Sequence, residues 1–376
     1  MSTPERRLAA VRGSAPEKRP TVRVLSAATA HSDCNFAMLA LATRTDLDKL
    51  CDGTHFEVAF GQDPQAFQRG QIFERRVKAA DYGELIKLLR EKADFPLTSV
   101  RVEDLRGRAQ PNAEGLRQRA TETRQLLRKI VRNANDAPNI IDGAVLTCSI
   151  AGQTAYFETD SLAAAAGGKL HVVEVKSFPI TDGRCDGGKL GGACDQAAWY
   201  ALLCQRELIE ENLPPNSVSD EGFIILPKGV GLNPTLLRQN LAARIRRAER
   251  LLATTPDPAE ILSGLTDDVR FPDLAIDPDA RLDKIEDLLD AVGTTYRPAC
   301  LQDCGMARLC RRRAHDSGLA TVCGSPIVRQ LPGVPSLPRA AELAKNATPD
   351  PRELHVADAL KRAAAVYERV LNRGAL

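Results

Sequence analysis

Several features are scarce in this sequence of 376 residues, and each absence narrows the class of protein. Aromatic residues make up 4% of the chain, and the formal net charge is +2, so no overall basic charge indicates a nucleic-acid partner. No apolar run is long enough to cross a membrane. No G-x-x-x-x-G-K-[ST] motif is present, so we expect no P-loop motor, such as that of a helicase, within this chain.

The first twenty residues also lack the apolar segment of a signal peptide, and their charge and prolines predict a loose tail. We therefore expect a cytoplasmic protein. Its ten cysteines would then lie in a reducing compartment. Disulfides are rare there, and clustered cysteines indicate a metal.

Helix and strand patterns alternate along the chain. Helices are expected at 34–50, 63–93, 111–135 and 196–211, strands at 21–27, 140–150, 153–165, 169–178 and 221–227, and a glycine-rich loop at 181–195. This order predicts an α/β fold with a mixed central sheet flanked by helices and helical additions at both ends. The expected parts are a disordered tail (1–20), a helical N-terminal part (21–135), a central core (136–230), a helical part with clustered cysteines (231–330) and a C-terminal helical extension (331–376).

Two charged side chains interrupt the apolar strand pattern "VVEVKSF" at 172–178. Residues two apart in a strand point to the same side, so Glu174 and Lys176 project together. Antiparallel pairing of "YFETD" with "KLHVVEVKSF" would bring Asp160 close to Glu174. Carboxylate oxygens are the ligands that Mg²⁺ or Mn²⁺ prefers, and a lysine stabilises charge on a phosphate. The strands therefore predict a metal-dependent site for phosphodiester hydrolysis.

The alternative interpretation is a structural ion pair, because an isolated E-x-K triplet is common by chance. Two further motifs favour a site. "GQIFE" places Glu74 on a helix upstream of the strands, and "QAAWY" places Gln196 and Tyr200 on one face of a later helix. Either motif alone would indicate ordinary helix surface.

The motifs "GQIFE", "ETD", "EVK" and "QAAWY" occur in that order, and the chain resembles the RecB-like branch of the PD-(D/E)xK nuclease superfamily. The resemblance implies a restriction-endonuclease-like core and metal-dependent hydrolysis of DNA, with exonuclease action on single strands favoured. It implies that Asp160 and Glu174 hold the metal, that Lys176 is the catalytic lysine, and that Glu74 replaces the histidine ligand of many relatives. The glutamine and tyrosine of "QAAWY" would contact the nucleic-acid backbone or order the site.

Three cysteines stand close together in "CLQDCGMARLC", namely Cys300, Cys304 and Cys310. Packing explains an isolated cysteine well but explains three in a charged segment poorly. A [4Fe–4S] cluster or a tetrahedral zinc site takes four thiolates, so the fourth must come from elsewhere. Cys34 and Cys51 are the upstream candidates.

This arrangement is similar to that of RecB-like nucleases with an iron–sulfur cluster, such as the CRISPR-associated exonucleases, which carry one cysteine before the core and three after it. The resemblance implies a [4Fe–4S] cluster and favours Cys34, which opens a helix after a short strand. Those relatives have two residues between the first two downstream cysteines, where this chain has three, so Cys323 is an alternative to Cys300. We expect a structural role, because a link between distant segments removes chain entropy from the unfolded state.

The remaining cysteines suggest no shared site. Cys148 and Cys204 lie in apolar runs and are expected in the core. Cys185 and Cys194 fall in the expected glycine-rich loop, where they would be thiols without a role.

Arginine-rich stretches at 117–132 and 238–250 are candidates for contacts with the DNA backbone. Two other classes of function compete with the nuclease. The first is a non-catalytic nucleic-acid-binding subunit. The presence of Asp160, Glu174 and Lys176 together argues against this class. The second is a zinc-stapled interaction protein whose carboxylates form structural ion pairs. A separate helicase or a repair or defence protein would be the expected protein partner.

Overall fold

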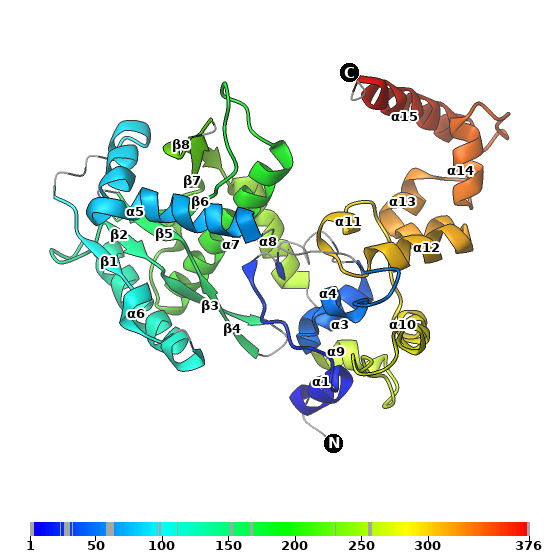
Figure 1. Ribbon diagram of the computed structural model, residues 1–376, viewed down its shortest axis with the longest axis horizontal. Helices are drawn as coiled ribbons and strands as arrows, with labels where there is room; N and C mark the ends of the chain where they lie inside the picture. The colour runs from blue at the N-terminus through cyan, green and yellow to red at the C-terminus, as the bar shows by residue number, and fades with distance from the viewer. Residues whose placement is uncertain are drawn as a thin grey trace. The chain divides into compact units, whose positions relative to one another are not determined.

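The computed structural model describes residues 4–22, 24–25, 31, 33–57, 64–95, 97, 99–110, 112–150, 153–165, 168–229, 231–254 and 258–373. The chain forms two compact units rather than five consecutive parts (Figure 1). Unit 2 comprises Arg19–Thr29 and Gly61–Asp257. Unit 1 comprises Met1–Lys18, Ala30–Phe60 and Pro258–Leu376, so it is assembled from both sides of unit 2 in the sequence.

Unit 2 is the α/β part of the molecule. Its helices are α5 (Pro64–Lys92), η1 (Arg106–Arg108), α6 (Ala113–Val131), α7 (Gly187–Glu210), η2 (Pro215–Ser217) and α8 (Ala242–Thr254). Its strands are β1 (Val102–Asp104), β2 (Ile140–Asp142), β3 (Val145–Ile150), β4 (Gln153–Glu158), β5 (Ser161–Ala164), β6 (Leu170–Val175), β7 (Glu221–Lys228) and β8 (Asn233–Asn240).

A mixed sheet of six strands in the order β1-β2-β5-β6-β7-β8 forms the centre of unit 2. The pairs β1–β2 and β6–β7 are parallel, and the other neighbours are antiparallel. Strands β3 and β4 form a separate antiparallel pair. The expected mixed central sheet flanked by helices is therefore present.

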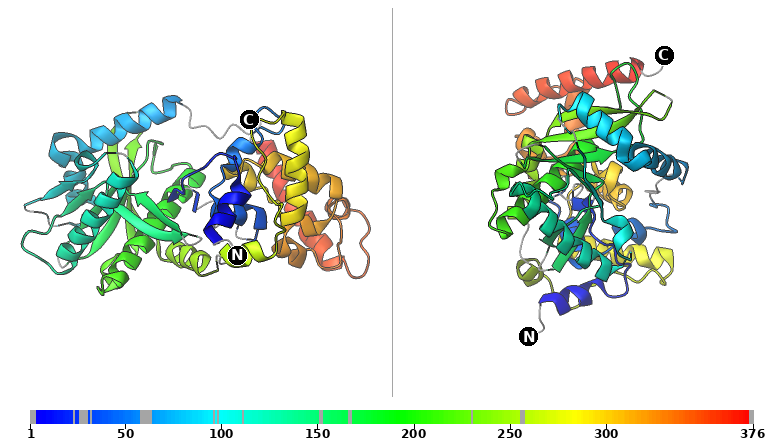
Figure 2. Two further views of the ribbon diagram at one scale, coloured as in Figure 1. Left: turned by 90° about the horizontal axis from the view of Figure 1, so that it is seen from below. Right: turned by 90° about the vertical axis from the view of Figure 1, so that its left-hand side faces the viewer.

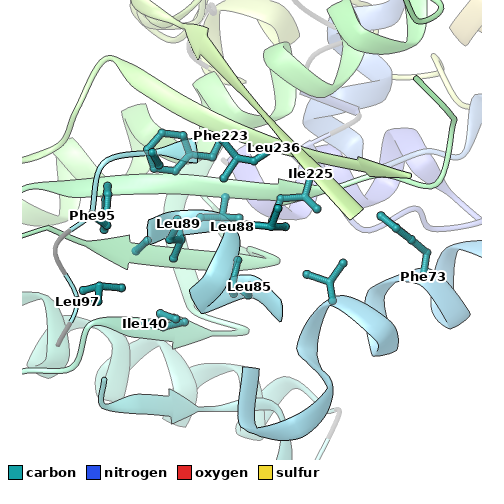
Figure 3. Packing of buried hydrophobic residues seen from close by; sticks show 14 residues of the cluster. Phe73, Leu85, Leu88, Leu89, Phe95, Leu97, Ile140, Phe223, Ile225 and Leu236 are labelled. Carbon is teal, nitrogen blue, oxygen red and sulfur yellow. The ribbon is translucent and has the colours of Figure 1, made fainter. Parts of the chain in front are cut away.

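Helices cover both faces of this sheet (Figure 2). On one face, α5 contributes Leu85, Leu88 and Leu89 to a buried cluster with Val173 and Phe223 of the strands (Figure 3). Because side chains alternate along a strand, the even-numbered residues of β6 lie on the opposite face. Helix α7 packs against β6 and β7, and α6 packs against α7. The two helix layers thus bury the strand that ends in the E-x-K triplet.

Helix α5 is broken in its middle. Ala80, Asp81 and Tyr82 adopt left-handed backbone conformations, with φ of 51°, 49° and 64°. Such conformations are costly for residues other than glycine. The break allows Tyr82 to donate a hydrogen bond to Asp142 at 3.0 Å, beside the candidate site described below.

Unit 1 is helical in its described residues. Its elements are α1 (Pro4–Arg12), α3 (Asn35–Thr43), α4 (Leu47–Leu50), α9 (Pro258–Ser263), α10 (Pro278–Val292), α11 (Cys300–Asp303), α12 (Ala307–Ser317), η3 (Ala320–Cys323), α13 (Ser325–Gln330), α14 (Leu337–Ala344) and α15 (Leu354–Arg373). Edge-to-face packing of Phe36 on Phe271, with ring centroids 5.5 Å apart, joins its N-terminal and C-terminal segments.

Four local expectations differ from the structure. The expected loose tail contains helix α1, whose Leu8 and Val11 are buried because they pack inside unit 1. The range 21–27, expected as a strand, has helical backbone at its described residues 22, 24 and 25.

The other two concern the second half of unit 2. The expected loop at 181–195 ends at Asp186, because its carboxylate caps α7 by accepting from Lys189 N at 2.9 Å. The arginine-rich stretch 238–250 begins in β8, where strand pairing with β7 prevails over its helical pattern.

Within the described ranges, no helix combines the length and apolar character needed to span a membrane.

We predict that Leu89→Ala destabilises unit 2 by roughly 2–5 kcal/mol, because it leaves a cavity between α5 and the sheet. Ile209→Ala is the control, since this α7 residue is 57% exposed and its loss should change the free energy of unfolding by about 0.5 kcal/mol at most. Urea unfolding followed by the fluorescence of Trp199, the single tryptophan, measures both variants. Equal effects of the two substitutions would contradict the packing described.

Candidate active site and cysteine group

The C-terminal end of β6 brings together two carboxylates and a lysine. The antiparallel register of β5 and β6 sets Asp160 beside Glu174. The backbone N–H of Val175 donates to Asp160 Oδ2 at 2.9 Å, which fixes this carboxylate. Lys176 Nζ lies 2.5 Å from Glu174 Oε1. The structure therefore places together the three residues that the strand patterns grouped.

Burial dominates the electrostatics of this group. Burial, reinforced by the Asp160 carboxylate and opposed by Lys176, raises the pKa of Glu174 to about 8. Burial also raises the pKa of Asp160, an effect that Lys176 offsets only in part. Burial alone would lower the pKa of Lys176, but the two carboxylates hold it above its ordinary value. The single positive charge of Lys176 is therefore not enough to balance the negative charge of the two carboxylates.

One oxygen of Glu174 is left without a donor. The residue is 2% exposed, and its Oε2 has no hydrogen-bond partner. A hydrogen bond to the adjacent Asp160 would exist only if one of the two carboxyls carried a proton. When both are ionised, Oε2 is a buried acceptor with nothing to accept from, an arrangement that costs about 1–3 kcal/mol.

Glu74, the third expected ligand, is already bound by two cations. Its Oε1 accepts from Lys78 Nζ at 2.6 Å, one helical turn further along α5, and also pairs with Arg106. Burial opposes ionisation of Glu74, but Lys78 and Arg106 bring its pKa below the ordinary value. Among the described residues, no three histidine, cysteine, aspartate or glutamate side chains converge in an arrangement ready to hold a metal.

Glu74 belongs to a line of contacts between side chains of alternating sign, which we call the charge chain. Its members in order are Asp142, Lys78, Glu74, Arg106, Glu158 and Arg119. The Asp142–Lys78 contact is 2.7 Å, and Arg106 and Arg119 lie 2.8 and 2.9 Å from Glu158. The buried Asp142 also accepts from Ser161 at 2.8 Å, so the charge chain is anchored next to β5.

Tyr200 contacts the backbone next to the site. Its hydroxyl donates to the backbone carbonyl of Glu158 at 2.6 Å, two residues before Asp160, and its side chain is buried. Burial, followed by the charges of Glu174 and Asp160, raises its pKa well above the ordinary value. Of the two expected roles, this geometry matches ordering of the site. Gln196 lies one turn earlier on α7 and is half-buried.

The arginine-rich stretches are partly used inside the protein. In α6, Arg119 is buried on Glu158, and Arg124 donates to Glu207 at 2.6 Å. In the second stretch, Arg238 pairs with Glu221 at 2.8 Å and Arg244 pairs with Asp195. Arg246, Arg247 and Arg250 of α8 are exposed. Fewer arginines are therefore exposed than the sequence pattern indicated.

Four cysteines of unit 1 lie close enough to influence one another. Burial, followed by the charges of Cys310, Cys300 and Cys34, raises the pKa of Cys304 well above its ordinary value. Burial, followed by the charges of Cys34 and Cys300, raises the pKa of Cys310 to about 12. These are the four that the sequence grouped, although their present arrangement is not that of a formed ligand set.

The alternative cysteines are less closely associated with this cysteine group. Cys51 affects Cys310 only weakly, and its sulfur contacts Met306 Sδ at 3.8 Å. Burial alone raises the pKa of Cys323. Cys34 and Cys300 thus influence Cys310 more strongly than Cys51 does, and the choice among the candidate ligands stays a prediction.

The other cysteines lie in unit 2. Cys148 and Cys204 are buried in β3 and α7, as expected. Cys194 is buried in α7 rather than in a loop, and Cys185 lies in the turn before this helix.

The sequence analysis missed a histidine beside the cysteine group. His31 Nε2 lies 2.7 Å from Asp303 Oδ1, and its Nδ1 lies 3.6 Å from Cys300 Sγ. Burial lowers the pKa of His31, but Asp303 and Cys300 together raise it to about 10. Its place three residues before Cys34 was the available signal.

Lys78, Arg106 and Asp142 were missed in the candidate active site. Lys78 follows Glu74 by four residues, a spacing that indicates an ion pair on one helix face. Asp142 ends an apolar strand, as functional carboxylates often do. Arg106 had no local signal, because 32 residues separate it from Glu74.

Comparisons with known proteins add little. No family model and no curated protein matches the chain. The chain is similar to a solved structure described as "Crystal structure of SSO0001", at 14% sequence identity and a TM-score of 0.20, over 48% of this chain and 91% of that chain. A likeness this low carries no argument about function.

The raised pKa of Glu174 predicts a pH dependence of stability. The unfolded carboxyl titrates near its ordinary value of 4.5 and the folded one near 8, so its stabilising contribution is complete below pH 4.5 and is lost as pH rises to about 8. Glu174→Gln removes this titration, and its amide would donate to Asp160. Relative to wild type, this variant should gain about 3–4 kcal/mol in free energy of unfolding as pH rises from about 5 to about 8, because each pH unit between the two pKa values is worth about 1.4 kcal/mol.

Urea unfolding at several pH values without divalent metal measures the difference. Glu210→Gln removes one carboxylate from the exposed face of α7 and is the matched control. A Glu174→Gln variant that follows the wild-type pH profile would contradict the buried, proton-sharing arrangement.

Proposed function

We propose that the chain is a Mg²⁺- or Mn²⁺-dependent nuclease that hydrolyses phosphodiester bonds of DNA, with single-stranded DNA as the favoured substrate. One observation carries the proposal. A buried carboxylate oxygen without a donor, Glu174 Oε2, lies beside a second, half-buried carboxylate and a lysine at the end of a strand.

These residues fit a hard divalent cation. Carboxylate oxygens in small numbers, with room for water, are what Mg²⁺ and Mn²⁺ prefer. A cation between Asp160 and Glu174 would satisfy the unpartnered oxygen and balance the excess negative charge. It would also return both carboxyls to the ionised state that burial disfavours.

The chain's own residues would then have distinct tasks. Asp160 and Glu174 would hold the metal, and a bound metal supplies a more acidic water and polarises a phosphoryl oxygen. Lys176 would stabilise negative charge that develops on the phosphate. Tyr200 would keep the segment before Asp160 in position through its bond to the Glu158 carbonyl.

The nature of the core is part of the proposal. The motifs that resemble the RecB-like nucleases all fall in unit 2, on α5, β6, α7 and the residue before β5. A restriction-endonuclease-like core with exonuclease activity is the interpretation that accounts for this grouping. The exposed arginines of α8 would contribute phosphate contacts, whose effect on DNA affinity weakens steeply with salt.

A [4Fe–4S] cluster held by Cys34, Cys300, Cys304 and Cys310 belongs to the same proposal. The mutual influence of these thiols supports it, because a cluster of this type takes four cysteine ligands. Its role would be structural. It would link the two parts of unit 1 that lie on either side of unit 2 in the sequence.

Two other functions give different results in the same experiments. In a non-catalytic DNA-binding subunit, the wild-type protein would not cleave DNA. Substitution of Asp160, Glu174 or Lys176 would then change only stability. In a zinc-stapled interaction protein, Glu174 and Lys176 would be a structural ion pair, and removal of one partner would strand the other and mainly lower stability.

Substitutions of Glu174 and Lys176 should have different effects on metal binding and on cleavage. Lys176→Ala keeps the carboxylates, so Mn²⁺ should still bind while cleavage falls by roughly 10²–10³. Glu174→Ala removes a ligand, so both Mn²⁺ affinity and cleavage should fall. Calorimetry with Mn²⁺ and cleavage of end-labelled single- and double-stranded DNA measure these effects in variants shown to be folded.

Lys169→Ala is the control, because this exposed lysine precedes β6 and donates to the Asn216 carbonyl at 2.5 Å, away from the carboxylates. Full nuclease activity in folded Lys176→Ala protein would reject the catalytic interpretation of this strand.

Protein purified without oxygen should contain about four irons per chain. Cys304→Ala should lose this iron and the associated brown colour, whereas Cys148→Ala, which removes a thiol of β3 in unit 2, should retain both. Iron and zinc analysis of the purified variants provides the measurement. Stoichiometric zinc without iron in wild-type protein would reject the cluster.

A further inference from the structure

A guanidinium group lies against the carboxylates of the candidate active site. Arg106 Nη1 pairs with Glu74 Oε1, its Nη2 lies 3.7 Å from Asp160 Oδ1, and its Nε donates to Glu158 Oε1 at 2.8 Å. Arg106 comes from η1, just after edge strand β1, and its side chain is 31% exposed. One cation thus touches three carboxylates while it remains accessible from solvent.

The backbone makes room for this side chain. Gly143, between β2 and β3, has a φ of +62°, and a Cβ there would lie 2.3 Å from Arg106 Cγ. The same Cβ would lie 2.9 Å from a guanidinium nitrogen of Arg119. A glycine at this position therefore permits Arg106 to reach the carboxylates, which a larger residue would prevent.

Arg106 and a divalent metal would need the same oxygens. Glu74 and Asp160 are two of the three expected ligands, and Arg106 pairs with both. Lys78 also holds Glu74, but its ammonium is bound on its other side by the buried Asp142. The other contacts of Arg106 are to Glu158, which is 37% exposed and is not an expected ligand, and to the Thr159 carbonyl at 3.4 Å. Arg106 is also the more exposed of the two cations, at 31% against 11% for Lys78, so Arg106 can leave the ligands toward solvent while it stays attached to the protein.

We infer that Arg106 is an exchangeable cation of the site: it pairs with Glu74 and Asp160 until a divalent metal takes them, and it then binds a phosphate of the nucleic acid. The inference rests on the proposed function. Once Glu74 and Asp160 are released, Nε can stay on Glu158 while Nη1 and an N–H of Nη2 bind two phosphate oxygens, a geometry that suits Arg particularly well. Before metal binds, the positive charge of Arg106 balances the carboxylates. After metal binds, the same charge pairs with the incoming substrate.

The first experiment is calorimetric titration of Mn²⁺ into the 376-residue chain. Arg106→Gln should bind Mn²⁺ about tenfold more tightly than wild type, because a competing unit charge a few Å from the metal is removed. Arg108→Gln is the matched control, since this residue of the same short helix pairs with Glu103 instead, and its Mn²⁺ affinity should equal that of wild type. A structural ion pair would give the opposite sign, since loss of Arg106 would loosen the site and weaken Mn²⁺ binding.

The second experiment measures affinity for a labelled single-stranded oligonucleotide with a phosphorothioate backbone, which resists hydrolysis. With Mn²⁺ present, Arg106→Gln should bind it about tenfold more weakly than wild type, as expected for loss of one charged phosphate contact. With a chelator instead of Mn²⁺, the two proteins should bind equally, because Arg106 is then engaged by the carboxylates. Arg106→Lys keeps the charge without the planar fork, and it should recover only part of the affinity.

The outcomes separate the inference from the proposed function. If wild type binds Mn²⁺ and Glu174→Ala does not, the metal site stands. Equal or weaker Mn²⁺ binding by folded Arg106→Gln, or a loss of DNA affinity that is the same with and without Mn²⁺, would then overturn only the role of Arg106. If wild type binds no Mn²⁺, the proposed function fails, and the inference fails with it.

Discussion

The antiparallel register between β5 and β6 fixes the two carboxylates at the centre of the candidate active site relative to each other. It sets Asp160 beside Glu174, and the bond from Val175 N to Asp160 Oδ2 holds this register at its critical point. A slip of one residue would move Glu174 to the face that packs on α5, where an apolar cluster would receive a carboxylate. The cluster of Leu85, Leu88 and Leu89 therefore protects the register as well as the stability of unit 2.

Several features of the site are unfavourable in free energy, and the stability of the surrounding structure must offset them. Glu174 is buried and Asp160 half-buried with too little compensating charge, and the break in α5 places three residues in costly conformations. In the neighbouring charge chain the signs alternate from Asp142 to Arg119, so that each of its charges has a neighbour of the opposite sign. Local unfavourable features with a stable surrounding core are typical of functional sites.

The sequence predicted the parts of the site that depend on local pattern. Asp160 and Glu174 are joined by a short hairpin, and alternation along β6 puts Lys176 on the same side, so their grouping follows from strand geometry. Arg106 could not be predicted, because it reaches Glu74 through the edge position of β1 and the space beside Gly143.

The fold shows the same limit. The mixed sheet could be predicted from the order of helices and strands, and the cysteine group from spacing. Strand β8 was missed because "RQN" at 238–240 continues the arginine pattern of α8, and only pairing with β7 makes it a strand. The division into units was missed because unit 1 depends on contacts between residues far apart in the sequence, such as Phe36 and Phe271.

The discontinuous make-up of unit 1 has a consequence during synthesis on the ribosome. The long segment of unit 2 is made without interruption, so its sheet and helices have what they need before translation is complete. Cys34, by contrast, emerges well before Cys300. At about 5–20 residues per second, roughly 15–50 s separate the two. For the proposed cluster to form, the newly made thiol of Cys34 would have to stay reduced and uncommitted for that time, so cluster assembly would depend on the cell's reducing power as well as on the sequence.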